Sequence, residues 1–440
     1  MNTLTKTSAA LAVGILSTFA TAASAQSLEA QTIDGRWDAS LIQKNTVIPF
    51  RLDISGSGPT LKATFYDGWK ANETTTAAKF ENGVLTLELE HYLTAITATY
   101  KNGKLTGTLG STSRQGSSSY GFEAKPYVAP NNLATDYPNI AGTWEIPLDK
   151  PTAKGEKTQR FVVQQDGPDI AATTLRVDGD SGSHVGTYKD GKWVISHFDG
   201  SRPGQLEVKL NSDGTLEISQ GGGRRAGGVA GSEDAAPGKL IAYRPEVARA
   251  KGFPEPENYL THTTVRDPNE PFAFSFPDAN GKLRSNTDPE FKGKVLLAIV
   301  TGTWCPNCHD EAQYLVQLYK KYHAQGLEIV ALDFEEAEQQ GSLERVHAFV
   351  KQYGVPYPYL IAGAPVEMWE KVPQAVNLNT WPATIFVGRD GLVKGVHSGF
   401  ASPAAGVFND QLKAEFTSTV ERLLAEKPAS GTPVASKAGF

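Results

Sequence analysis

The amino-acid sequence predicts a multidomain protein: two tandem antiparallel β barrels or sandwiches, followed by an α/β domain. Residues 31–244 consist of short runs of alternating or β-branched residues separated by turn residues, a pattern typical of antiparallel sheets. Sequence landmarks in this β-rich region occur twice and in the same order. After residue 270 the pattern changes to apolar runs that alternate with i, i+3, i+4 spacing, which indicates strands alternating with helices.

The N-terminus has the features of a secretory signal peptide. Lys6 supplies positive charge, residues 9–20 are largely apolar, and Ala23–Ser24–Ala25 is an A-x-A cleavage signal. We therefore expect residues 1–25 to be removed. The apolar run is shorter than the roughly 20 residues that a membrane span needs, so we expect a soluble chain that does not span a membrane. Its expected location is an extracytoplasmic space, most simply a bacterial periplasm, where disulfides can persist.

The net charge limits the possible binding partners, and the chain length indicates the number of domains. The 440-residue chain has a formal net charge of −6, and an acidic protein is poorly suited to bind nucleic acid or an anionic membrane surface. We therefore expect no nucleic acid among the partners. A chain of this length usually divides into two or three domains.

The β-rich region divides into two units, predicted over residues 26–130 and 131–245. Ile33–Trp37 is echoed by Ile140–Trp144, an offset of 107 residues (140 − 33), which indicates one ancestral unit that was copied. We expect the two tryptophans of these segments to fill the cores of their units. Type I′ hairpin turns need positive φ at both central positions, which favours Asn-Gly and Asp-Gly pairs. Four such pairs are Asn82–Gly83, Asn102–Gly103, Asp190–Gly191 and Asp213–Gly214.

Composition marks the remaining boundaries. Residues 219–238 are rich in glycine, and we expect a mobile loop because so little apolar surface cannot offset the entropy of ordering. Residues 246–270 are proline-rich and irregular, which predicts a linker. The α/β domain is then expected over residues 271–428, and residues 429–440 are expected to form a flexible tail.

The α/β region alternates apolar runs, which predict buried strands, with amphipathic stretches, which predict helices. In chain order we expect a hairpin at 272–285, a strand at 294–304, a helix from Pro306 to Gly326, a strand at 327–334, a helix at 342–354, an extra strand and short helix at 357–372, two strands within 380–400, and a helix from about 407 to 426. This order describes a mixed sheet covered by helices.

The chain has two cysteines, Cys305 and Cys308, in the stretch Trp304-Cys-Pro-Asn-Cys. Closing so short a loop removes little entropy from the unfolded chain, so a structural staple is an unsuitable role. Pro306 can begin a helix, and the positive end of a helix favours the thiolate form of the first cysteine. A thiolate attacks disulfides, and a second thiol resolves the mixed disulfide. We therefore predict that Cys305 exchanges with substrate and that Cys308, the more buried thiol, closes the ring.

A zinc site is the main alternative for a Cys-x-x-Cys pair. Structural zinc needs four ligands, and a second cysteine pair is missing from the sequence. We therefore expect no metal. The dithiol itself would carry the electrons, so no separate cofactor is expected.

These residues resemble the TlpA/ResA group of extracytoplasmic thioredoxin-like disulfide oxidoreductases. The resemblance covers roughly residues 271–426 and includes the hairpin, the Trp-Cys-Pro-Asn-Cys motif, the central insertion and the Trp-Pro pair that follows it. It implies a thioredoxin-like fold in which Pro382 is a cis-proline that faces the cysteines and shapes a substrate groove, together with Trp304, Pro306 and Trp381. Glu311 matches an acidic residue that would tune the thiols and shuttle a proton from Cys308.

The sequence departs from the family pattern beside the motif. Ile299 leaves the strand before the motif without a buried acid, which places more of the proton handling on Glu311. Ala312–Gln313 stands where proline usually follows that glutamate. His309 directly follows the motif, and we expect it to be exposed; the less favoured alternative is a direct role in lowering the thiol pKa. These departures affect the potential and the partner choice more than the disulfide chemistry.

The leading functional hypothesis is an extracytoplasmic thiol–disulfide oxidoreductase. Reduction of protein disulfides, apocytochromes among them, is the direction that the resemblance implies, and it requires a membrane thiol electron donor. One alternative is a binding protein in which the β units capture a ligand or partner and the redox domain is accessory. Another is a peroxidase-like antioxidant, but the hydroxyl residue that a peroxiredoxin places three positions before its reactive cysteine is here Gly302.

Overall fold

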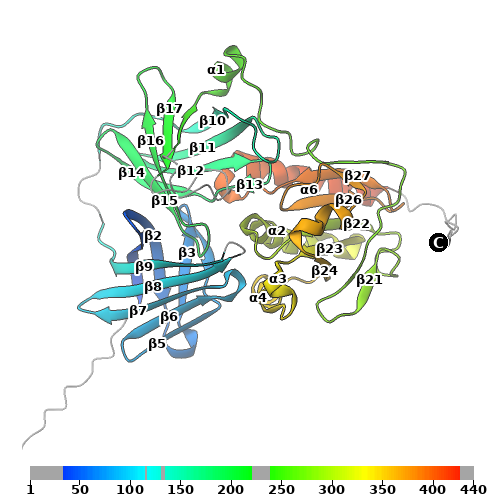
Figure 1. Cartoon of the computed structure of the whole chain (residues 1–440), viewed down its shortest axis with the longest axis horizontal. Helices are drawn as coiled ribbons and strands as arrows, with labels where there is room; N and C mark the ends of the chain where they lie inside the picture. Colours follow the sequence, from blue (N-terminus) through cyan, green and yellow to red (C-terminus); the bar gives the residue numbers. More distant parts are fainter. Residues whose placement is uncertain (1–32, 114–115, 130–133, 221–237, 427–440) are drawn as a thin grey trace, which may run out of the picture. The chain divides into compact units, whose positions relative to one another are not determined.

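The computed structural model describes residues 33–113, 116–129, 134–220 and 238–426 (Figure 1). The predicted signal peptide, the predicted tail from residue 429 and most of the predicted Gly-rich loop lie outside the described residues. Ser219 and Gln220, the first residues of the predicted loop, belong instead to strand β17 (Leu216–Gln220). Within the described part of the chain, no helix is long and apolar enough to cross a membrane.

The first β unit is a nine-stranded antiparallel sheet with the order β4-β3-β2-β1-β9-β8-β7-β6-β5. Strand β1 pairs with both the second and the last strand of the unit. Its buried side chains alternate along the strand and include Trp37, which is 4% exposed. The strands are β1 (Gly35–Gln43), β2 (Thr46–Ser55), β3 (Lys62–Asp67), β4 (Lys70–Thr74), β5 (Ala77–Glu81), β6 (Val84–Leu89), β7 (Thr94–Lys101), β8 (Lys104–Ser113) and β9 (Gly116–Pro126).

The second β unit is also a nine-stranded antiparallel sheet, with the order β10-β11-β12-β14-β15-β16-β17-β18 and β13 paired to β12. Glu145 and Tyr243 exchange backbone hydrogen bonds of 2.7 and 2.8 Å, which bring the two ends of the sheet together. The remaining strands are β10 (Gly142–Pro147), β11 (Thr158–Asp166), β12 (Asp169–Arg176), β13 (Gly179–Asp180), β14 (His184–Lys189), β15 (Lys192–His197), β16 (Gly204–Leu210) and β18 (Lys239–Ala242).

Both β units place their first strand between their second and last strands, which is the relationship that a copied unit predicts. The predicted antiparallel β region is confirmed as two β-rich sheets with barrel-like curvature (Figure 1). Trp144, the counterpart of Trp37, is 2% exposed and packs in the core of the second sheet. Both tryptophans therefore fill cores, as the sequence predicts.

Three of the four predicted type I′ turns have positive φ at both central residues: Asn82–Gly83, Asn102–Gly103 and Asp190–Gly191. Asp213–Gly214 also lies in a hairpin, between the paired strands β16 and β17, but the predicted turn type is wrong there, because only the glycine has positive φ. The Asp213 carboxylate instead accepts hydrogen bonds from the backbone N–H and the hydroxyl of Thr215, at 3.0 and 2.7 Å. A side chain that bonds the backbone two residues ahead favours a different turn.

The segment predicted as a linker contains regular structure. Helix α1 (Pro245–Ala250) begins with proline at its first position, where the missing N–H costs nothing. Strand β19 (Thr264–Val265) pairs with β25 (Ala375–Val376). Proline content alone therefore marks this segment poorly, since proline also suits helix starts.

The C-terminal region contains a five-stranded mixed sheet with the order β24-β23-β22-β26-β27. Strands β22, β23 and β24 run parallel, whereas β26 is antiparallel to β22 and to β27. The strands are β22 (Val295–Thr301), β23 (Leu327–Phe334), β24 (Tyr359–Gly363), β26 (Ala383–Val387) and β27 (Val393–Ser398), and the predicted hairpin is β20 (Ser275–Pro277) with β21 (Leu283–Ser285). The helices are α2 (Pro306–Tyr322), α3 (Ala337–Gln340), α4 (Glu344–Tyr353), α5 (Met368–Lys371) and α6 (Val407–Ala425).

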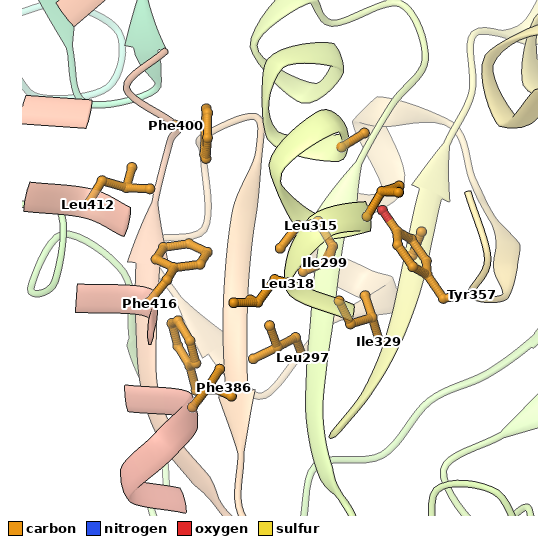
Figure 2. Packing of buried hydrophobic residues seen from close by; sticks show 14 of the residues in the cluster. Leu297, Ile299, Leu315, Leu318, Ile329, Tyr357, Phe386, Phe400, Leu412 and Phe416 are labelled. Carbon is orange, nitrogen blue, oxygen red and sulfur yellow. The ribbon is translucent and has the colours of Figure 1, made fainter. Parts of the chain in front are cut away.

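Strand β22 is buried on both faces, which explains its continuous apolar run. Leu297 and Ile299 belong to one core, where they meet Leu315 of α2 and Phe416 of α6 (Figure 2). The alternate residues of β22, including Ala298, belong to a second core on the other face of the sheet. The cysteine motif begins at Cys305, four residues after the end of this fully packed strand.

Candidate active site

The two cysteines lie at the junction between strand β22 and helix α2. Cys305 has extended backbone and precedes the helix, and Pro306 is the first helical residue. The Cys305 N–H donates to Gly302 O at 3.0 Å, and the Cys308 N–H donates to Cys305 O at 3.0 Å. Both cysteines are free thiols, with exposures of 4% for Cys305 and 1% for Cys308. Cys308 is thus the more buried thiol, as predicted, although Cys305 is also nearly covered.

The thiol of Cys308 is held in its protonated form. Burial raises the pKa of Cys308 well above its ordinary value, and the neighbouring Cys305 thiol adds to the shift. A hydrogen bond with Thr301 opposes this shift without cancelling it. Before Cys308 can attack, its proton must therefore pass to another group.

Glu311 is one group that can receive this proton. It lies three residues after Cys308 on α2 and is 1% exposed. The Thr384 hydroxyl donates to Glu311 Oε1 at 2.6 Å. Burial raises the pKa of Glu311 to about 8, although the Thr384 hydrogen bond lowers it. A carboxyl that titrates near neutral pH is suited to general acid–base chemistry.

A second buried acid, Asp333, lies on the neighbouring strand. The parallel ladder places Asp333 of β23 beside Thr301 of β22, the strand that leads to the cysteines. Asp333 is fully buried, and burial together with Glu335 raises its pKa well above the ordinary value. The prediction that Glu311 takes a larger share of the proton transfer is therefore incomplete, because Asp333 is a second buried acid beside the strand that leads to the motif. Strand β22 lacks an acid at Ile299, but β23 supplies one.

A buried ion pair fixes the chain just before the motif. The backbone N–H of Thr303 donates to Glu335 Oε1 at 2.8 Å, and Arg345 Nη2 donates to Glu335 Oε2 at 2.7 Å. Arg345 Nε also donates to the Thr303 hydroxyl at 3.0 Å. All three residues are at most 2% exposed. The sequence does not indicate this triad, because nothing local links positions 303, 335 and 345.

The residues predicted to line the substrate groove meet at Cys305. The Trp381–Pro382 peptide bond is cis, the isomer that the resemblance implies. The Cys305 thiol donates to Trp381 O at 3.5 Å, and the rings of Trp304 and Trp381 lie edge to face with centroids 5.2 Å apart. Pro306 is the first residue of α2, directly after Cys305. The structure therefore brings the predicted cysteine and groove residues into one site.

His309 departs from its predicted exposure, because it is completely buried. Its Nε2 donates to Thr303 O at 2.7 Å, and its Nδ1 lies 2.8 Å from the Tyr353 hydroxyl. Tyr92 of the first β unit stacks on the ring, with centroids 4.2 Å apart. Burial lowers the pKa of His309 well below its ordinary value. The ring is therefore a neutral packing and hydrogen-bonding group.

Residues 269–396 match the model of the AhpC/TSA family. The C-terminal region is a thioredoxin-fold domain. The resemblance drawn from the sequence is confirmed for this part of the chain, and the mixed sheet with the cysteine motif after β22 agrees with it. The β units lie outside the family match.

The thioredoxin-fold domain is similar to thiol-disulfide oxidoreductases named ResA. The ResA of Bacillus subtilis (strain 168) is 32% identical over 126 residues, which are 29% of this chain and 64% of that protein. The ResA of Bacillus thuringiensis subsp. konkukian (strain 97-27) is 34% identical over 122 residues, which are 27% of this chain and 62% of that protein. The chain thus spans just under two thirds of the length of these curated relatives.

Solved structures with similarity to the chain include two proteins of thiol–disulfide chemistry. One is a thiol:disulfide interchange protein of the thioredoxin family from Chlorobium tepidum TLS, with 25% identity and a TM-score of 0.28, covering 37% of this chain and 99% of that one. The other is a secreted thiol-disulfide isomerase from Corynebacterium glutamicum, with 15% identity and a TM-score of 0.31, covering 40% of this chain and 97% of that one.

Proposed function

We propose that this protein is an extracytoplasmic thiol–disulfide oxidoreductase that reduces protein disulfides through a Cys305–Cys308 dithiol cycle. The observation that carries the proposal is the position of the two free cysteines at the N-terminus of α2, with the Cys305 thiol in contact with Trp381 O. Similarity to proteins named thiol-disulfide oxidoreductase ResA supports it.

The proposed cycle moves two electrons to the substrate. The Cys305 thiolate attacks one sulfur of a substrate disulfide, whose S–S bond breaks as the bond to Cys305 forms. The other substrate sulfur leaves as a thiolate and takes up a proton. Cys308 then loses its proton, and its thiolate attacks Cys305 Sγ. The second substrate thiol is released, and the enzyme is left with a Cys305–Cys308 disulfide.

Proton transfer from Cys308 limits the second attack. Glu311 lies on the same face of α2, since residues three apart on a helix are neighbours. With a pKa of about 8, the ionised fraction of Glu311 accepts the Cys308 proton and the protonated fraction returns it to the leaving thiolate. This exchange assigns Glu311 the role of general acid and base.

The surroundings of Cys305 define the proposed substrate site. Trp304, Pro306, Trp381 and Pro382 would line a groove for an extended polypeptide that carries the disulfide. Substrates are proteins with disulfides, apocytochromes among them, and a membrane thiol donor would restore the dithiol. The dithiol is the redox group, without a further cofactor. The A-x-A signal before residue 26 supports a periplasmic or other extracytoplasmic location.

The two other hypotheses have weaker support. A peroxidase needs a hydroxyl residue near the reactive cysteine, but Gly302 stands three positions before Cys305. The nearby Thr303 hydroxyl is already bonded to Glu335 and Arg345. The double variant Cys305→Ser/Cys308→Ser distinguishes an enzyme from a binding protein with an accessory redox domain. A purely binding role would remain intact in this variant.

The test is turnover of a protein disulfide, such as that of insulin, by the purified chain without residues 1–25. We expect thiol-driven turnover that is abolished in the double serine variant. Turnover equal to that of the small-thiol control would contradict the proposal. Equilibration in thiol redox buffers then decides the direction: a potential near about −270 mV identifies a reductant, and one near about −120 mV identifies a disulfide donor.

A further inference from the structure

Asn307, which lies between the two cysteines, is held by the second β unit. Its side-chain Nδ2 donates to the backbone oxygen of Asp178 at 2.9 Å. Its Oδ1 accepts from Arg202 Nη1 at 3.1 Å. Asn307 is 6% exposed. Both ends of the amide within the redox motif are therefore bonded to residues more than a hundred positions earlier in the chain.

Arg202 also bridges two buried acidic side chains. Its Nη2 lies 3.1 Å from Asp199 Oδ2 and 3.5 Å from Asp310 Oδ2. Asp199 belongs to the same loop, between β15 and β16, whereas Asp310 lies two residues after Cys308 on α2. The guanidinium thus joins the β unit to the first turns of the helix that carries the cysteines.

Four acids and the imidazole of His197 lie around Arg202. Burial would raise the pKa of Asp199, but His197 and Arg202 hold it well below its ordinary value, so Asp199 is ionised. Burial raises the pKa of Asp310 well above its ordinary value, while Arg202 opposes the shift. Asp67 and Asp180 face the same cluster. Arg202 and His197 therefore both compensate the ionised Asp199, and Arg202 does so while it is bonded to Asn307 of the redox motif.

A second contact of the same β unit reaches the loop after β27. Gly179 of β13 forms a parallel bridge with Phe400, and the Ser402 N–H donates to Asp180 Oδ2 at 2.6 Å. A Cβ added at Gly179 would clash with Phe400 O. This loop is tied to the cis-proline, because the Gly399 N–H donates to Pro382 O at 2.8 Å. The β unit therefore contacts both the cysteine helix and the cis-proline side of the site.

We propose that Arg202 is a positioning residue of the redox centre, which orients Asn307 and supplies the buried positive charge that sets the reduction potential of the Cys305–Cys308 pair. The inference rests on the proposed function and assigns the second β unit a part in it. A buried cation beside the helix start favours the thiolate of the reduced form, whereas the disulfide is neutral. Loss of the cation would remove one of the two side chains that compensate Asp199, leaving His197, and would favour the disulfide.

The test measures the reduction potential of the chain without residues 1–25 in glutathione or dithiothreitol buffers, with thermal melts to confirm folding. For Arg202→Gln we expect the dithiol–disulfide equilibrium to move about tenfold toward the disulfide, about 30 mV lower in potential. Arg202→Lys should recover part of this shift, because it keeps the charge but not the planar fork. Arg160→Gln is the matched control: Arg160 lies on β11 of the same β unit and bonds the Tyr259 hydroxyl at 3.3 Å in the segment after α1, so its loss should leave the potential unchanged.

A variant that should shift the reduction potential in the opposite direction separates an electrostatic role of Arg202 from a structural one. Asp199→Asn leaves the Arg202 charge less compensated, so we expect the equilibrium to move several-fold toward the dithiol. If Arg202→Gln does not fold, the Asp199→Asn result alone decides. A folded Arg202→Gln with the wild-type potential, or an unchanged or lowered potential in Asp199→Asn, overturns the inference. A wild-type chain that does not turn over protein disulfides would instead overturn the proposed function.

Discussion

The Thr384 hydroxyl donates a 2.6 Å hydrogen bond to the buried carboxyl of Glu311. Thr384 lies on β26 and is completely buried, two residues after the cis-proline. The bond therefore links the cis-proline strand to the acid that follows the cysteines on α2. It also opposes the effect of burial on the pKa of Glu311.

Replacing Thr384 by valine tests this link. Without the hydroxyl, burial acts unopposed, and the pKa of Glu311 should rise above about 8. The pH at which disulfide turnover rises should move upward by the same amount, while Thr384→Ser should keep the wild-type profile. The measurement is turnover of a protein disulfide against pH. Superimposable profiles for valine and serine would show that Glu311 does not limit turnover.

Glu311 should also make stability depend on pH. Its pKa is about 8 when folded, against an ordinary value of 4.5, so the folded state holds the proton more tightly than the unfolded state. The contribution of protonated Glu311 to the free energy of unfolding should therefore be fully present below pH 4.5. It should be lost as pH rises through about 8, by up to a few kcal/mol. In Glu311→Gln this decrease should be absent. Denaturant unfolding at several pH values checks this, and parallel curves for both proteins would contradict it.

The Arg345–Glu335 ion pair should be important for stability. Arg345→Ala leaves the buried Glu335 carboxylate without its cation, and we expect a loss of about 3–5 kcal/mol. Arg422→Ala is a matched control, because its pair with Glu426 is exposed, with side chains 56% and 43% accessible. That control should lose less than about 1 kcal/mol. Equal losses in urea unfolding would show that the buried pair has no special role.

Gly399→Ala tests the contact between the second β unit and the cis-proline loop. Gly399 has φ +72°, and an added Cβ would clash with the Val177 backbone oxygen. Gly191 has φ +81° with nothing within 4 Å of an added Cβ, so Gly191→Ala measures the backbone strain alone, about 1–2 kcal/mol. Gly399→Ala should lose at least about 1 kcal/mol more. Equal unfolding free energies would mean that this contact does not form.

The parts of the site that local sequence encodes could be predicted. The apolar run before Cys305, the proline after it and the Trp381–Pro382 pair each carry their signal within a few residues. One local signal was missed: Asp333 is an acid at the end of the apolar run Leu-Glu-Ile-Val-Ala-Leu-Asp-Phe. An ionisable residue in so apolar a strand could have indicated a buried carboxyl.

The contacts between distant segments could not be predicted. Arg202 and Asn307 are 105 positions apart, and their bond depends on how a β-unit loop packs against α2. His309 follows the motif like an exposed residue of a helix start, but Tyr92 and Tyr353 cover it. Composition and periodicity describe each segment by itself, so they do not show which faces pack together.

Trapping of a mixed disulfide by Cys308→Ser tests the central claim most directly. This variant keeps the attacking thiol but lacks the resolving one, so it should accumulate a covalent adduct with a disulfide substrate. Mass spectrometry of the non-reduced adduct should place the bond at Cys305, and Cys305→Ser should give no adduct. Normal turnover by Cys308→Ser, or an adduct formed by Cys305→Ser, would contradict the two-thiol cycle.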